Sequence, residues 1–177
     1  MKFAVALLLA AASFSAQAQN QWVLTQSSIT WHIVHPMHEA EGTSHAAKGK
    51  GICNNGTCNF LIAVPLNTFS SGDSNRDLHM IETVRGAQFP MVVVRTEMPQ
   101  SELTAGTLRL NLDVQFAGQT AHYQDVPFQR IQHGDEVEIK GTIPATCSDF
   151  KIDRPSFLTV PIHNEIPVGV DVTWKPM

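Results

Sequence analysis

The most constraining feature of this sequence is a set of segments in which apolar and polar side chains alternate. Residues 107–116 alternate throughout, with Leu, Val or Phe at every even position and mostly charged or amide side chains between them. Side chains of a β-strand point alternately to its two faces, so this pattern predicts a strand with one apolar face. Similar alternation, or a β-branched run, recurs at 29–33, 60–66, 91–95, 137–140 and 168–175.

Turn-forming residues separate these segments, which predicts about eight antiparallel strands. One-sided strands in this number must bury their apolar faces, either in a second layer or by closing into a barrel. We expect one helix, at about Asp73 to Arg85, and no linker or repeat divides the chain. The turn signals are Gly42, Asn55-Gly56, Pro99-Gln100, Gly118, His133 to Asp135 and Asp153 to Pro155.

The first 18 residues have the pattern of a secretory signal peptide. A positive start at Lys2 precedes a short apolar run, and small residues end the segment at Ala16 and Ala18. This arrangement predicts cleavage before Gln19, export to the periplasm, and a mature domain at 19–177. The first residue after the expected cleavage is Gln19 and not a cysteine, which argues against a lipid anchor there.

Charge and hydropathy argue against nucleic-acid binding and against a membrane-spanning helix in the mature chain. The chain has 12 basic and 16 acidic residues, and no basic run, so we expect no nucleic-acid binding. After the leader, no segment reaches the roughly 20 apolar residues that a membrane-spanning helix needs, so we expect no integral membrane segment in the mature chain.

Two cysteines flank a predicted hairpin turn. Asn55-Gly56 is the strongest short signal for a two-residue hairpin, and it places Cys53 opposite Cys58. Non-hydrogen-bonded pairs approach to about 4.5 Å between Cα atoms, which is short but compatible with a disulfide. In an exported chain we expect a cross-strand disulfide rather than a metal pair, because partners at zinc-site spacing are missing. Cys147 remains, either as a small buried residue or as a reactive thiol.

The segment 71–80 concentrates polar side chains in a short connection. Gly72 and Asp73 supply turn and N-cap chemistry. In the helix that follows, Arg76 and His79 share one face while Asp77 points elsewhere. Two interpretations remain open: Arg76 or Asp77 ties the helix to the rest of the fold, or Arg76 and His79 contact the polar head of a ligand.

Four histidines fall within fourteen residues, beside Met37 and Glu39. A copper, zinc or haem site is one interpretation, with His35, His38 and His45 as candidate ligands if the chain bends at Pro36. A polar strand end in solvent is the other. Elsewhere no catalytic motif is present, so we expect a protein that is not an enzyme. The histidines are His32, His35, His38 and His45.

Several motifs, in order along nearly the whole mature chain, resemble the YceI-like family of exported, lipocalin-like barrels. Arg76, Asp77 and His79 match its Arg-Asp-x-His signature. Two departures mark a divergent branch: Glu82 to Ala87 replaces an acidic and aromatic block, and the Cys53–Cys58 hairpin and the histidines are not family features. The other matching stretches are Ser28 to His35, Gly42 to Gly51, Gln88 to Val92, Leu110 to Pro127 and Gly141 to Phe157.

The resemblance implies an all-β, eight-stranded antiparallel lipocalin-like barrel with one short helix. It also implies that the barrel holds an isoprenoid lipid or a quinone tail. Such an apolar chain is bound by being removed from water, so it needs a dry tunnel with few polar contacts. The tunnel would be lined, and its mouth formed, by Trp31, Phe60, Ile62, Phe69, Arg76, His79, Met80, Phe89, Leu110, Leu112, Val114 and Phe116.

Three functions from different classes therefore stand as hypotheses. The first is a periplasmic carrier or sequestering protein for an isoprenoid lipid or quinone. The second is a metal- or haem-binding redox accessory protein that uses the histidines between His32 and His45. The third is an interaction domain whose barrel is filled by its own side chains. Either a monomer or a homodimer is compatible with all three.

Overall fold

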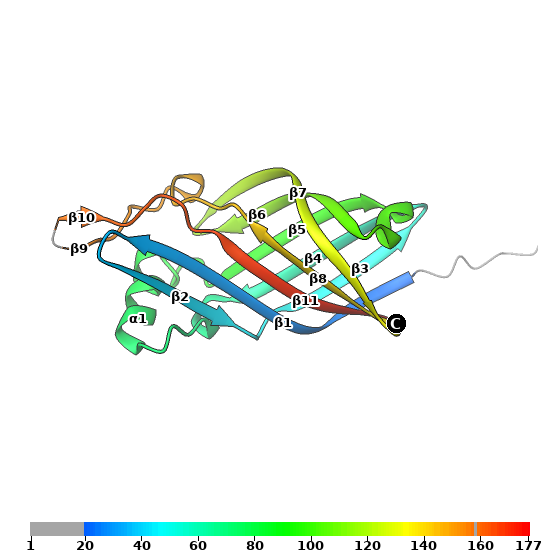
Figure 1. Ribbon diagram of the computed structural model, residues 1–177, viewed down its shortest axis with the longest axis horizontal. Coiled ribbons are helices and arrows are strands. Elements are labelled where there is room, and N and C mark those ends of the chain that lie inside the picture. Colours follow the sequence, from blue (N-terminus) through cyan, green and yellow to red (C-terminus); the bar gives the residue numbers. More distant parts are fainter. Residues whose placement is uncertain (1–19, 158) are drawn as a thin grey trace, which may run out of the picture.

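The computed structural model describes residues 20–157 and 159–177, so the expected leader and its cleavage position lie outside the described part (Figure 1). Strands predominate, with one α-helix and three short 3-10 helices among these residues. The elements are β1 (Asn20–His35), β2 (His38–Ser44), β3 (Lys48–Asn54), β4 (Thr57–Pro65), η1 (Leu66–Thr68), α1 (Ser74–Thr83), β5 (Met91–Pro99), η2 (Gln100–Thr104), β6 (Thr107–Phe116), β7 (Gln119–His133), β8 (Glu136–Ile143), η3 (Ser148–Phe150), β9 (Ser156–Phe157), β10 (Val160–Pro161) and β11 (Val168–Pro176).

Eight of these strands close into an antiparallel barrel, which confirms the predicted fold class. The order is β1-β3-β4-β5-β6-β7-β8-β11, and β11 pairs back with β1 along Trp22 to Trp31. Strand β2 is additional, since it pairs with the second half of β1 while β3 pairs with the first four residues. Closure leaves no unpaired edge among these eight strands, and it buries the apolar face of each strand inside the barrel.

The alternation in the sequence corresponds to the inside and outside of the barrel wall. Along β6, each of Leu108, Leu110, Leu112 and Val114 is buried, and each residue between them is exposed. Each of the other barrel strands contributes buried side chains to the same core cluster. The apolar faces therefore converge on one interior, as the strand pattern predicts.

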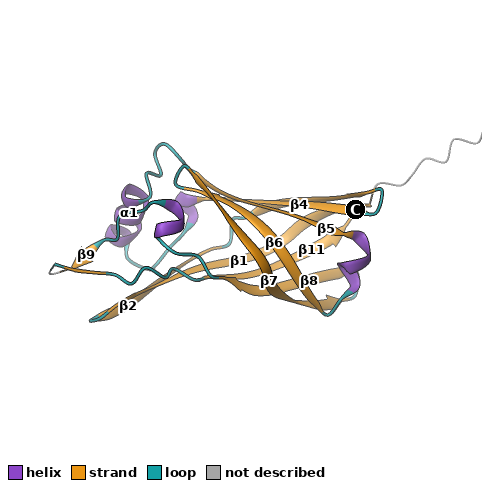
Figure 2. Cartoon of the chain, turned by 90° about the horizontal axis from the view of Figure 1, so that it is seen from above, coloured by secondary structure: helices purple, strands orange, loops and turns teal. Residues whose placement is uncertain are grey.

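The two ends of the barrel are built differently (Figure 2). At one end, which we call the helix end, lie α1, η1, η3, the β1–β2 hairpin and the small β9–β10 pair. At the other, the disulfide end, lie the β3–β4 and β7–β8 hairpins, η2 and the C-terminus. No helix in residues 20–157 or 159–177 has both the length and the apolar character that crossing a bilayer requires.

Helix α1 begins where the capping signal predicts and ends two residues earlier than expected. The carboxylate of Asp73 accepts hydrogen bonds from the backbone N–H groups of Asn75 and Arg76, at 2.9 and 3.2 Å. The Asp77 carboxylate accepts from the Ser71 N–H at 2.9 Å, and Ser70 pairs with Thr43 of β2 through two backbone bonds. These contacts join the start of the helix to the barrel wall.

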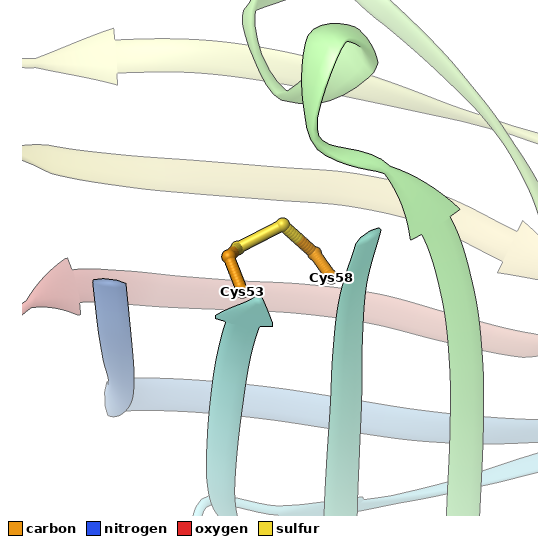
Figure 3. The surroundings of a disulfide bond; sticks show 2 residues. All are labelled: Cys53 and Cys58. Carbon is orange, nitrogen blue, oxygen red and sulfur yellow. A yellow bond between two sulfur atoms is a disulfide. The ribbon is translucent and has the colours of Figure 1, made fainter. Parts of the chain in front are cut away.

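The predicted disulfide is present at the tip of the β3–β4 hairpin (Figure 3). Cys53 and Cys58 are directly paired in register, with 4.0 Å between their Cα atoms. Asn55 and Gly56 have φ values of 51° and 81°, and positive φ at both positions is what a two-residue turn of this type needs. Cys147 is buried as a free thiol, as the simpler of its two interpretations predicts.

Candidate functional site

An apolar cavity of about 540 Å³ occupies the interior of the barrel. Strands β1, β2, β4 to β8 and β11 line it, and α1 and the segment after β8 contribute side chains at the helix end. Eleven of the twelve side chains predicted to form the tunnel lie in this lining. They are Trp31, Phe60, Ile62, Phe69, Arg76, His79, Met80, Leu110, Leu112, Val114 and Phe116.

Phe89 is the predicted residue that lies outside the lining. Its ring covers Gly118 in the β6–β7 turn, within 2.6 Å of where a Cβ would stand. The guanidinium of Arg85 lies 5.6 Å from the ring centroid, and the same side chain donates a hydrogen bond to the Ala117 carbonyl. Phe89 therefore packs the outside of a turn, next to the segment that replaces the family's acidic and aromatic block.

The large rings leave the interior open because they lie over glycines of neighbouring strands. A Cβ on Gly51 of β3 would stand 2.3 Å from the Phe60 ring, and one on Gly49 would stand 2.7 Å from Trp174. On β2, Gly42 is covered in the same way by Trp31. Rings held against the wall take the space of missing side chains, so strand β3 itself contributes nothing to the lining.

Helix α1 presents one face to the cavity at the helix end. Arg76, His79, Met80 and Thr83 line it, which is the shared face that helical spacing predicts. Arg76 and His79 remain exposed to solvent, and His79 lies 3.9 Å from Glu82. Asp77, on another face, makes the bond to Ser71 that joins the helix to the barrel. The structural interpretation of the signature thus applies to Asp77, and Arg76 and His79 stand where a polar head could reach them.

His35 and His38 meet across the β1–β2 turn, as the bend at Pro36 predicts. Their ring centroids are 4.9 Å apart. His35 is buried; its Nδ1 accepts from the Met37 N–H at 3.2 Å, so Nε2 carries the proton and donates to the Val160 carbonyl at 3.1 Å. Nδ1 thus fixes the ring on the β1–β2 turn, and Nε2 joins this turn to β10.

The other two histidines of the group point to separate partners. His45 hydrogen-bonds to the Ser27 carbonyl at 2.9 Å, and His32 lies 3.6 Å from Glu39. Within residues 20–157 and 159–177, no three His, Cys, Asp or Glu side chains are grouped so that they could hold a metal ion. The candidate ligands His35, His38 and His45 therefore do not form a common site in this part of the chain.

The segment after β8 covers the helix end through contacts that the sequence did not reveal. The Tyr123 hydroxyl of β7 donates to the Asp149 carboxylate at 2.7 Å, and this carboxylate also accepts from the Thr146 N–H. Burial and the neighbouring carboxylate raise the pKa of Tyr123. Burial opposes ionisation of Asp149, but these hydrogen bonds outweigh it and lower the pKa of the carboxyl group. Phe150 is 1% exposed, with its ring centroid 5.2 Å from that of Phe116.

Three further polar residues, Trp22, Thr96 and Arg130, line the cavity toward the disulfide end. Sequence reasoning missed them, although alternation along β7 could have indicated Arg130, which follows the buried Val126 and Phe128 at the same period. The cavity is thus apolar along its length and has polar groups toward both ends. Such a space suits a long apolar molecule with a polar terminus.

No protein-family model and no curated protein sequence matches this chain. Solved structures do match it, among them a YceI protein from Campylobacter jejuni, with a TM-score of 0.53 at 11% identity over 67% of this chain and 72% of that one. The chain has the YceI-like barrel fold. BcnA from Burkholderia cenocepacia matches with a TM-score of 0.70 at 12% identity, over 83% of this chain and 95% of that one.

A polyisoprenoid-binding domain from Saccharophagus degradans, implicated in plant cell wall breakdown, is a further solved structure that this chain resembles. It matches with a TM-score of 0.72 at 10% identity, over 88% of this chain and 98% of that one. At these identities the comparisons establish the architecture, and they confirm the family resemblance of the sequence at the level of the fold.

Proposed function

We propose that this chain is an exported carrier or sequestering protein that holds an isoprenoid lipid or a quinone tail inside its barrel. The observation that carries the proposal is the apolar cavity of about 540 Å³ enclosed by the closed sheet. Ligand pockets typically have volumes of about 300–1,000 Å³. The neighbour from Saccharophagus degradans, described as polyisoprenoid-binding, supports the choice of ligand class.

The energetics of the lining suit a long hydrocarbon chain. Each CH₂ group removed from water contributes about 0.8 kcal/mol, so binding strength grows with chain length. Aliphatic walls offer no directional contact along the chain, and the polar groups near the ends can then select the head. Two sets of polar groups could take this role: Arg76 and His79 at the helix end, or Trp22, Thr96 and Arg130 toward the disulfide end.

Export to the periplasm belongs to the same proposal. It rests on the leader pattern of residues 1–18, and the Cys53–Cys58 disulfide supports it because such bonds persist in oxidising compartments. We propose a monomer or a homodimer as the functional unit.

Native mass spectrometry of the protein purified from its own periplasm tests the proposal. We expect a co-purifying mass that organic extraction identifies as an isoprenoid or quinone. Val94→Trp should fill the interior and remove this mass, whereas Val93→Trp, one residue along β5 and outside the lining, should keep it. A folded wild-type protein with neither bound lipid nor metal would instead indicate the interaction domain, and bound metal would indicate the redox accessory protein.

A further inference from the structure

Four polar donors in the cavity wall are buried without a hydrogen-bond partner among the described residues. Three of them lie toward the disulfide end: the indole Nε1 of Trp22, the hydroxyl of Thr96 and the Nε of Arg130. The fourth, the indole Nε1 of Trp31, lies in the half of β1 that pairs with β2. Buried polar groups are almost always satisfied, and leaving one unpaired costs about 1–3 kcal/mol. Three such groups toward one end of the lining therefore lack hydrogen-bond acceptors, which a bound ligand could supply.

The three donors belong to the disulfide end of the barrel. Trp22 is the third residue of β1, while Thr96 and Arg130 are each the fourth from the end of their strands, β5 and β7. In the antiparallel barrel, the start of β1 and the ends of β5 and β7 lie at this same end (Figure 1). Phe60 connects two of them, since its ring centroid is 6.5 Å from that of Trp22 and its backbone pairs with Thr96.

The charge of Arg130 has no counter-ion in the part of the chain that the structure describes. Among residues 20–157 and 159–177, no carboxylate lies within 4.0 Å of its guanidinium, and the side-chain hydrogen bond recorded there goes to the Gln132 amide oxygen. Two acidic residues of the adjacent β7–β8 hairpin are in ion pairs, Asp135 at 3.2 Å from Lys175 and Glu138 between His133 and Lys140. The third, Glu136, accepts from the Thr25 hydroxyl at 3.4 Å. A partly buried cation without a counter-ion is unfavourable in an apolar cavity.

We propose that the disulfide end of the cavity binds the oxyanion terminus of the ligand, a carboxylate or a phosphate, with the apolar chain running toward α1. This inference rests on the proposed function and gives the ligand a charge and a direction. An oxyanion offers several lone pairs to the guanidinium, indole and hydroxyl donors, and charge-assisted bonds of this kind are the strong ones. The Arg130 charge selects against a ligand whose end is a neutral alcohol or a bare hydrocarbon.

Matched pairs of ligands test the charge. Calorimetry on delipidated protein would compare geranylgeranyl phosphate with geranylgeraniol, and palmitate with hexadecanol. We expect each oxyanion to bind roughly 10-fold or more tightly than its alcohol, and Arg130→Gln to abolish this preference. The pair with the larger preference identifies phosphate or carboxylate as the natural terminus.

Arg95→Gln is the matched control, because Arg95 is exposed on β5 beside Thr96 and lies outside the lining. It should keep the full preference. Trp22→Phe, which removes one donor and retains a ring, should reduce oxyanion affinity by roughly 2- to 10-fold and serves if Arg130→Gln does not fold. Equal binding of oxyanion and alcohol by the wild-type protein would overturn the inference and leave the proposed function standing, whereas binding of neither would contradict the proposed function itself.

Direction is tested by a fatty acid with a photoreactive diazirine at the methyl end. We expect it to label α1, in the region of Met80 and Val84, because the carboxylate would lie at the other end of the cavity. Labelling of Met98 or Leu103 at the disulfide end would show the reverse orientation and overturn the inference.

Discussion

The two ends of the barrel differ in how far the protein itself satisfies their polar groups. At the helix end, both nitrogens of the buried His35 engage the backbone, and Tyr123 and Asp149 engage each other, while the Nε1 of Trp31 is left unsatisfied by the described residues. At the disulfide end, Arg130 and Trp22 each bury a donor that the described residues leave unsatisfied. Satisfied networks stabilise and orient elements, whereas unsatisfied groups in a cavity are available to a ligand. The difference indicates that packing and internal hydrogen bonds hold the helix end, and that more donors are left without a protein partner at the disulfide end.

The largest effect is expected when the packing at the helix end is removed. Phe150→Ala deletes a fully enclosed ring that contacts Phe116, so the free energy of unfolding should fall by about 3–5 kcal/mol. Urea denaturation followed by circular dichroism measures this. Phe89→Ala is the control, because that ring is 36% exposed on a turn; a loss as large as that of Phe150→Ala would contradict the assignment of the packing to η3.

Removing the disulfide should act at the opposite end and by a smaller amount. The bond closes a short loop, so Cys53→Ala with Cys58→Ala should lower the free energy of unfolding by about 2 kcal/mol. Hydrogen exchange should accelerate in the β3–β4 hairpin and remain unchanged in α1. Faster exchange in α1 would show that the two ends are coupled, and reductant added to wild-type protein is the matched control.

The helix cap gives a smaller and local effect. Asp73→Ala leaves the N–H groups of Asn75 and Arg76 without their acceptor, which should cost about 1 kcal/mol. Exchange should then accelerate in α1 and not in the hairpin, the reverse of the disulfide variant. Ser74→Ala, at an exposed first position of the helix, should change neither; a similar loss in that control would exclude the cap as the cause.

The smallest expected effect on the free energy of unfolding concerns Tyr123, and it is seen only at alkaline pH. Because its pKa is raised in the folded state, the unfolded phenol ionises near its ordinary pKa of 10.0 while the folded one stays protonated. The contribution to stability is therefore complete below pH 10 and declines above it. Tyr123→Phe should remove this alkaline decline.

The phenolate absorbance of the wild-type protein reports Tyr123 alone, since the chain has one tyrosine. Titration of the folded protein with a midpoint near 10 would contradict the contact with Asp149.

Local sequence signals accounted for much of the fold. Alternation identified the wall strands, Asn55-Gly56 predicted both the hairpin and the disulfide, and Asp73 predicted the start of the helix. These succeed because each depends on residues close in the chain, through side-chain period, positive φ or a cap. The same period placed Leu110, Leu112 and Val114 in the cavity lining.

The elements that depend on distant residues were not predictable in this way. Phe89 was expected at the tunnel, but tertiary packing places it over Gly118, twenty-nine positions later. The pairing of Tyr123 with Asp149 joins β7 to η3 across 26 positions, and no local pattern marks it. The division between β2 and β3 was likewise not evident, since both pair with β1 at different points.

The sequence by itself determined that this chain makes one-sided antiparallel strands, a capped helix and a disulfide-tipped hairpin, because those depend on neighbours in the chain. Only the tertiary structure decided that the strands close around an open interior, because that depends on Trp31 and Phe60 lying over Gly42 and Gly51 of other strands. Tertiary structure also decided which polar groups stay unsatisfied, since whether Arg130 has a partner depends on side chains that only the closed barrel brings near it.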